Sequence, residues 1–146
     1  MSKITPFLWF NDNAEEAMNF YCSIFKNSKQ GKVTPMSVIF ELEGQEFFGL
    51  NGGPNFKFNE AVSFFVKCET QSEVDFYWEK LQAGGGSESR CGWLKDRFGL
   101  SWQIIPGRLT ELLGDKDPKR ANAALQAMLK MSKIVIADLE KAAKAA

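Results

Sequence analysis

The chain has 146 residues, of which 45% are hydrophobic and 13% aromatic, so it is long enough for one domain with a sizeable core and unlike an intrinsically disordered chain. Its 18 basic and 18 acidic residues cancel, and no run of lysine or arginine stands out, so we expect no nucleic acid and no membrane as partner. No apolar stretch approaches the ~18 residues of a membrane span, and polar residues interrupt the N-terminus too early for a signal peptide. We therefore expect a cytoplasmic protein.

The first half of the chain predicts a strand, a helix and three more strands. The first strand is expected over residues 4–10 and the helix over 14–27. The other three strands are expected in the part of 31–40 before Thr34-Pro35, over 37–43 and over 47–51. Asn13 and Glu16 have the spacing of a capping box at the start of the helix. Val38, Phe40 and Leu42 share one face of their strand, which predicts a sheet with one buried side.

The second half predicts a similar order of elements, with two strands after the helix where the first half has three. A buried strand over 61–68 is followed by a helix that Thr70 and Glu73 cap and Gly84-Gly85-Gly86 ends. Strands over 88–94 and 100–105 follow. The strand that begins at Thr5 then corresponds to the strand that begins at Ser63, and Phe20-Tyr21 corresponds to Phe76-Tyr77. Two copies of a strand–helix–strand–strand–strand unit are the simplest interpretation.

The last part of the chain is a helical tail over residues 107–146. Asp117-Pro118 has the chemistry of a helix start, with Asp as cap and Pro in the first turn. The apolar residues that follow form one stripe, and residues 134–143 form a last short helix. We expect the tail to pack on the domain or on a partner subunit.

Five motifs together resemble the PhnB-like family, a branch of the glyoxalase or vicinal oxygen chelate superfamily whose members are often labelled demethylubiquinone methyltransferase domains. The motifs are Ile4-Thr5-Pro6-Phe7-Leu8-Trp9-Phe10, Phe20-Tyr21-x-x-Ile24-Phe25, Leu50-Asn51-Gly52-Gly53-Pro54, Cys91-Gly92-Trp93-Leu94-Lys95-Asp96 and Gly99-Leu100-Ser101-Trp102-Gln103-Ile104. The likeness is expected to cover nearly the whole chain, helical tail included.

The resemblance implies an α+β fold in which paired βαβββ modules form a glyoxalase-like open barrel, followed by C-terminal helices. The chain is then a single glyoxalase-like domain, residues 1–146, with module one at about 1–54, module two at about 60–106 and the tail at 107–146. Such proteins are usually homodimers, and family members tend to carry a longer connection near Lys32–Pro35.

Metal-dependent relatives in this superfamily place His or Glu ligands on the first, fourth, fifth and eighth strands. Carried over by motif, these places become Thr5, Gly49 or Asn51, Ser63 and Gln103. The chain contains no histidine, and hydroxyl or amide groups bind divalent metals weakly. We therefore predict no metal and no other cofactor, and interpret Glu41, Glu43 and Glu46 as solvated hairpin residues.

Strand alternation predicts a cup lined by aromatic rings and a few polar groups. The predicted ligand-binding residues are Thr5, Phe7, Trp9, Asn51, Ser63, Phe65, Lys67, Trp93, Ser101 and Gln103. Lys67 is a candidate anion contact. For Phe7 and Phe65, burial in the core is the preferred alternative. Lys95-Asp96 is expected to serve a turn, and Cys91, beside Arg90 but without a histidine base, is expected to be a structural thiol.

The sequence thus favours a homodimer that binds a small, partly apolar molecule in a metal-free cup. The alternative is an atypical metal-dependent enzyme of the glyoxalase or dioxygenase type that takes carboxylates from elsewhere. A methyltransferase ranks last, because Gly84-Gly85-Gly86 follows a helix and does not open one. A pure interaction module without a ligand also stays open.

Overall fold

The computed structural model describes residues 2–146, and the chain divides into two compact units, Met1–Phe58 and Asn59–Ala146. The division falls within the loop over residues 54–60 that the sequence places between two modules. Whether the chain acts as one domain stays a prediction.

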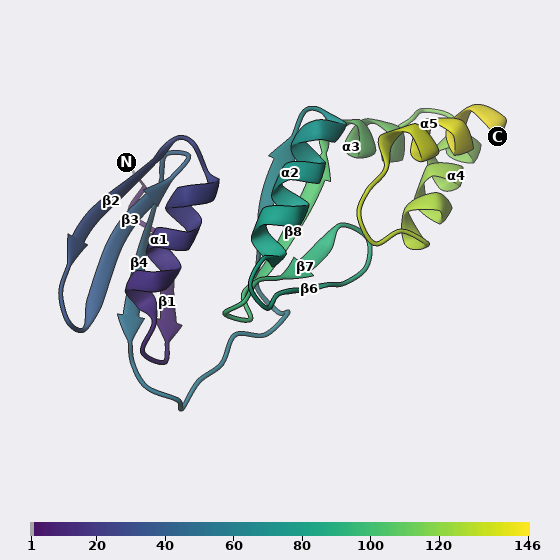
Figure 1. Cartoon of the computed structure of the whole chain (residues 1–146). Helices are drawn as coiled ribbons and strands as arrows, with labels where there is room; N and C mark the ends of the chain where they lie inside the picture. Colours follow the sequence, from purple (N-terminus) through teal and green to yellow (C-terminus); the bar gives the residue numbers. More distant parts are fainter. Residues whose placement is uncertain (1) are drawn as a thin grey trace. The chain divides into compact units, whose positions relative to one another are not determined.

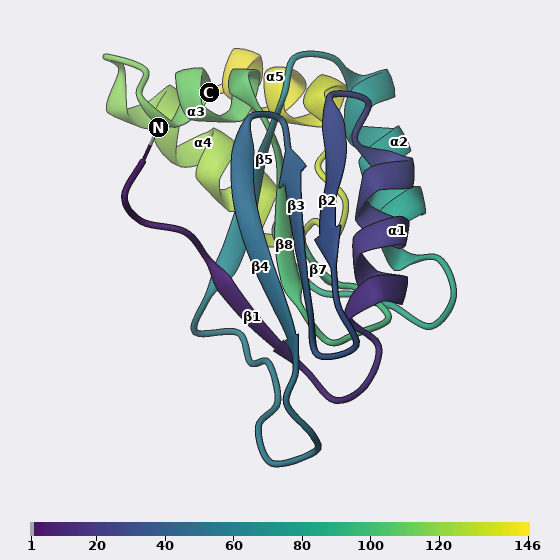
Figure 2. The same cartoon turned by 90° about the vertical axis from the view of Figure 1, so that its left-hand side faces the viewer.

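The first unit consists of one helix and a four-stranded sheet. Its elements are β1 (Phe7–Phe10), α1 (Ala14–Ile24), β2 (Ser28–Val33), β3 (Ser37–Leu42) and β4 (Gln45–Asn51). The strands lie side by side in the order β1-β4-β3-β2, with β1 parallel to β4 and the other pairs antiparallel (Figure 2). The helix ends at Ile24, earlier than expected, because Phe25 takes an extended conformation.

The first unit buries one face of its sheet against α1. Val38, Phe40 and Leu42 are buried, as their alternation predicts. The Phe40 ring lies between the rings of Tyr21 and Phe47, at centroid separations of 6.1 and 5.3 Å. Burial of a large apolar side chain contributes roughly 1.5–3 kcal/mol, so this face stabilises the unit while the opposite face stays open.

The second unit repeats the order of the first and adds a tail. Its first elements are β5 (Ser63–Cys68), α2 (Gln71–Gln82), β6 (Ser87–Glu88), β7 (Trp93–Lys95) and β8 (Ser101–Pro106). The sheet order is β5-β8-β7-β6, with β5 parallel to β8. The predicted α+β fold of paired βαβββ modules with C-terminal helices is therefore confirmed, and neither sheet closes on itself.

Two expectations about strands in the second unit are wrong. The strand expected over 88–94 is divided, because Cys91 and Gly92 have positive φ angles of 58° and 86° and their amides bond to the tail. The strand expected to be buried over 61–68 exposes Phe65 and Lys67. The α2 helix covers only one side of this sheet.

The helix cap predicted from the sequence is observed in the second unit but not in the first. The Thr70 hydroxyl accepts a hydrogen bond from the Glu73 amide at 3.2 Å, as predicted for α2. The capping box expected at Asn13 and Glu16 is wrong, because the Asn13 side chain makes no cap bond. Instead, the Ala14 amide at the start of α1 donates to Oδ1 of Asn51 at 2.9 Å.

A buried carboxylate organises the turn between β7 and β8. Asp96 is only 2% exposed, and its Oδ1 accepts hydrogen bonds from the amides of Phe98 and Leu100. Its Oδ2 accepts from the indole of Trp102 at 2.9 Å. The expected turn role of Asp96 is therefore confirmed, because three donors occupy its carboxylate.

The tail consists of three helices that gather at the end of β8 (Figure 1). They are α3 (Gly107–Leu113), α4 (Pro118–Leu129) and α5 (Ile136–Ala145). The predicted cap is confirmed, since Oδ1 of Asp117 accepts from the Lys119 amide at 2.9 Å. The tail packs on the second unit itself through one buried cluster. The cluster comprises Ile105, Leu109, Leu112, Ala124, Ile134, Leu139 and Ala143. Within residues 2–146, no helix combines the length and apolarity needed to cross a bilayer.

Gln71 clamps the tail to the start of α2. Its Nε2 donates to the carbonyl of Ile134 at 2.9 Å, and its Oε1 accepts from the amide of Ile136 at 2.8 Å. A salt bridge of 2.8 Å between Lys133 and Asp75 lies beside it and lowers the pKa of the Asp75 carboxyl. One side chain thus satisfies two backbone groups just before α5 begins.

We predict that Gln71→Leu destabilises the second unit by about 1–3 kcal/mol, since two partly buried backbone groups lose their partners. Urea unfolding measures the loss, and hydrogen exchange should accelerate over residues 134–145. Gln126→Leu on the exposed side of α4 is the matched control and should leave both unchanged. Equal stability and equal exchange in the two variants would contradict the clamp.

Candidate functional site

The strand register of the second unit places three predicted residues in one row on the open face of its sheet. Phe65 of β5 lies opposite Gln103 of β8, and Trp93 of β7 lies on the other side of Gln103. Side chains of register partners share a face, whereas Trp102 and Ile104, one position away from Gln103, are buried on the face that packs against α2. Two aromatic side chains therefore flank one amide.

Polar groups gather on the same face toward the start of β8. Nε2 of Gln103 donates to the Ser63 hydroxyl at 2.9 Å. Ser101 is fully buried, and its hydroxyl has no hydrogen-bond partner among residues 2–146. Lys95, the register partner of Ser101, forms a salt bridge with Glu60 and lowers the pKa of that carboxyl through their hydrogen bond.

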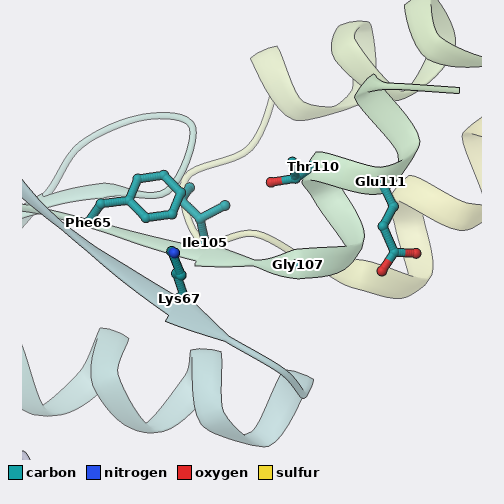
Figure 3. A pocket seen from close by; sticks show the side chains of 6 residues that line it. All are labelled: Phe65, Lys67, Ile105, Gly107, Thr110 and Glu111. Carbon is teal, nitrogen blue, oxygen red and sulfur yellow. The ribbon is translucent and has the colours of Figure 1, made fainter. Parts of the chain in front are cut away.

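Two adjoining depressions lie where this open face meets the tail. The larger, about 360 Å³, is lined by Phe65, Lys67, Ile105, Gly107, Thr110 and Glu111 (Figure 3). The smaller, about 240 Å³, shares Phe65, Ile105 and Thr110 with it. Its other lining residues are Cys91, Trp93, Gln103, Leu109, Leu113 and Met128. Pockets for small ligands typically measure ≈ 300–1,000 Å³ and are mostly apolar with a few polar groups, which matches this lining.

Phe7 and Trp9, two of the four predicted residues of the first unit, lie on the open face of its own sheet. Phe7 is 60% exposed, and the Thr5 hydroxyl contacts Oε1 of Glu46 at 3.4 Å. The Trp9 indole donates to the carbonyl of Gly53 at 2.9 Å and packs edge to face on Phe56. The preferred alternative of a core position is therefore wrong for Phe7, and it is equally wrong for Phe65, which is 50% exposed.

Asn51 lies on the opposite face of the first sheet from Phe7 and Trp9, so the expectation that it shares their face is wrong. Its register partner is the buried Phe10. Its Oδ1 caps α1, and its Nδ2 donates to the carbonyl of Pro35 at 3.2 Å. Two structural hydrogen bonds account for this amide, and a ligand contact at Asn51 stays a prediction.

Glycine is required at position 52, the next position of the motif from Leu50 to Pro54. A Cβ atom at Gly52 would lie 2.3 Å from the indole ring of Trp9. Only glycine fits under the ring at this distance, and Gly53 then turns with a φ of 94° to accept the indole hydrogen bond. The motif from Leu50 to Pro54 therefore builds the end of the first sheet.

Six of the ten predicted residues are thus brought to one face of the second sheet, namely Ser63, Phe65, Lys67, Trp93, Ser101 and Gln103. Sequence reasoning missed the wall that α3 and α4 add, which includes Leu109, Thr110, Leu113 and Met128. The apolar stripe that contains Met128 was visible in the sequence, but nothing in it showed that the stripe would meet β8.

The residues at the expected metal positions do not fit a divalent catalytic metal. Ser63 and Gln103 hydrogen-bond to each other, and the Thr5 hydroxyl contacts a single carboxylate, that of Glu46, among the residues that the structure describes. Across residues 2–146, no three His, Cys, Asp or Glu side chains lie close enough to hold a metal ion. Hydroxyl and amide donors without carboxylate or imidazole partners bind such ions weakly.

The three cysteines are free thiols. Burial raises the pKa of Cys68 to about 12, and the charge of Glu73 adds to the shift. Burial also raises the pKa of Cys22. Both thiols are therefore protonated near neutral pH and poor nucleophiles. Cys91 is the cysteine that borders the depression.

The fold and the open-faced sheets define a protein of the glyoxalase-fold class, and comparison with solved structures agrees. A protein of Pseudomonas aeruginosa matches with a TM-score of 0.61 and 19% identity, covering 73% of this chain and 98% of its own. FosX from Listeria monocytogenes, a fosfomycin resistance protein solved with Mn(II) and sulfate, matches with a TM-score of 0.53 and 16% identity over 70% of this chain and 87% of its own. At these identities the likeness shows the fold alone.

The family follows from two closer matches. The family model described as 3-demethylubiquinone-9 3-methyltransferase matches residues 2–105. A PhnB protein from Bacillus cereus, described as a candidate 3-demethylubiquinone-9 3-methyltransferase, is 36% identical over 72% of this chain and 99% of its own, with a TM-score of 0.67. The chain belongs to this PhnB-like family. No curated protein matches it.

The same matches correct one expectation about the tail. The family model ends at residue 105, within β8. The resemblance therefore stops before α3 and does not extend through the helical tail as expected. The helices that wall the depression are an addition of this chain to the matched region.

We predict that Asn51→Ala destabilises the first unit by about 1–2 kcal/mol, because the amide at the start of α1 loses its acceptor. Asn51→Asp should recover most of this loss, since a carboxylate accepts the same hydrogen bond and suits the positive end of the helix. Thermal or urea unfolding measures the difference. Asn55→Ala, in the exposed loop after β4, is the control. If Asn51→Ala is as stable as this control, Asn51 does not serve as the cap.

Proposed function

We propose that this PhnB-like protein binds a small, partly apolar molecule on the open face of the β5-β8-β7 sheet, and does so without a catalytic metal. The observation that carries the proposal is the row of Phe65, Gln103 and Trp93 at the edge of an apolar depression. The homodimeric state that the resemblance implies and the cytoplasmic location stay predictions.

The chemistry of this row suits recognition of a ligand with one polar group. Half of the Phe65 surface is exposed, so a bound molecule would remove apolar area from water at roughly 25 cal/mol per Å². Gln103 uses one N–H for Ser63, which leaves its carbonyl oxygen and its second N–H for a ligand. Ser63 orients that amide, because its hydroxyl accepts the bond.

An atypical metal-dependent enzyme is the second candidate, and one contact favours it. Glu46 supplies a carboxylate beside Thr5, the first of the expected ligand positions. A methyltransferase has less support, because the triple glycine that ends α2 is explained by packing. A Cβ at Gly86 would lie 2.5 Å from the backbone carbonyl oxygen of Lys95, and Gly84 and Gly85 have positive φ angles of 79° and 123°.

A fragment screen by two-dimensional NMR of the full chain tests the proposal. Hits should shift the indole resonance of Trp93 and the side-chain amide of Gln103. Gln103→Leu should weaken the best hit about fivefold to tenfold, which corresponds to one hydrogen bond of about 1 kcal/mol. Gln126→Leu should leave its affinity unchanged. If no hit reaches Trp93 and Gln103, or if the two variants bind equally, the proposal is wrong.

The same titration separates the two candidates. Under the metal-free proposal, EDTA or added Mn²⁺ changes the affinity of the hit by less than about twofold, because no group at the site needs the ion. A hit that binds only with Mn²⁺ would favour the metal-dependent enzyme instead.

A further inference from the structure

We infer that the helical tail makes the depression a pocket for a small amphiphilic anion, a carboxylate that carries a hydrocarbon chain or ring. The inference rests on the proposed function and names the class of ligand for the same face. It concerns residues beyond position 105, where the family match ends. The tail contributes Thr110, Leu113 and Met128 to this subsite, whereas Phe65, Lys67 and Ile105 belong to the matched region.

The tail supplies an apolar wall opposite the sheet. Leu113 of α3 and Met128 of α4 line the smaller depression together with Phe65 and Ile105 of the sheet. Leu113 is 38% exposed and Phe65 is 50% exposed, so apolar surface on both sides faces solvent. A hydrocarbon group between them would bury both surfaces at once.

The wall is held in place by the core beneath it. Leu109 and Leu112 of α3 are buried in the cluster that also contains Ile134 and Leu139, and Gln71 clamps the segment between α4 and α5. Close-packed interiors have low compressibility, so this core holds α3 in a fixed position. The depression is therefore formed before a ligand arrives, which lowers the entropic cost of binding.

Charge at the rim selects an anion. Lys67 borders the larger depression and forms no salt bridge among residues 2–146. Glu111 also borders it, but its Oε2 accepts from Arg108 at 3.2 Å and its side chain points away from Phe65 and Ile105 (Figure 3). Of the two charged residues that line the larger depression, Lys67 is the one without a salt-bridge partner among residues 2–146.

A hydroxyl that lines the same depression adds a second donor. The Thr110 side chain points its oxygen toward Ile105 and Phe65 (Figure 3). An ammonium and a hydroxyl can both donate to one carboxylate, and donors to an ionised acceptor form stronger hydrogen bonds than neutral pairs. The apolar wall and this pair of donors together fit an amphiphilic carboxylate better than a neutral or cationic ligand of the same size.

Titration of the full chain with octanoate and with octanol, followed by NMR, tests the inference. Octanoate should shift the resonances of Phe65, Lys67 and Thr110 and bind more tightly than octanol. Lys67→Gln should weaken octanoate about threefold to fivefold, in line with a partly solvated charge contact, and leave octanol unchanged. Leu113→Ser should weaken both probes about fivefold, because it removes apolar contact area.

Two substitutions in the same tail serve as matched controls. Lys141→Gln removes an exposed ammonium of α5, and Leu129→Ser removes an exposed leucine of α4 that does not line either depression. Both should bind octanoate as the parent does. Amide spectra of all four variants should overlay away from the substituted positions, which shows that the fold is retained.

The failure of this inference differs from the failure of the proposed function. If octanoate causes no shift, or if Lys67→Gln and Leu113→Ser bind it as tightly as their controls, the anionic amphiphile is wrong. A fragment that still shifts Trp93 and depends on Gln103 would then uphold binding on the sheet face and overturn only the role given to the tail.

Discussion

The parallel pairing of the first and last strand of each βαβββ unit is the constraint on which the site depends. In the second unit it places Ser63 beside Ser101 and Phe65 beside Gln103, although these residues are far apart in the chain. The helix between the paired strands covers one face of the sheet, so residues of the other parity lie on the face that this helix leaves uncovered. A shift of one position in the register would move the side chains of the shifted strand to the covered face.

The tail converts part of that open face into a concave surface. Ile105, at the end of β8, is buried because Leu109 and the rest of the tail cluster pack around it, whereas Phe65 across the strand pair remains half exposed. The start of α3 at Gly107 therefore determines which part of the second sheet the tail covers. Because α3 follows β8 directly, the matched family region and the added helices share one site.

The sequence predicted the features that follow from the alternation of side chains along a strand. Alternation assigned Ser63, Phe65 and Lys67 to one face, and the register agrees. Contacts between residues far apart in the chain could not be predicted from the sequence. Spacing alone favoured Asn13 as the cap of α1, but Asn51 takes that role from β4. Asn51 follows Leu50 in β4, so the two side chains point to opposite faces of the sheet. Leu50 is the partner of Trp9 and shares its face, whereas Asn51 shares the face of Phe10. The tail wall depends on packing that no local pattern encodes.

The most direct test of the account is a crystal structure of the full chain grown with octanoate. The account predicts a hydrocarbon chain between Phe65 and Leu113, with its carboxylate at hydrogen-bond distance from the Lys67 ammonium or the Thr110 hydroxyl. A depression filled by its own side chains, or octanoate bound only at surfaces away from the second sheet, would contradict it.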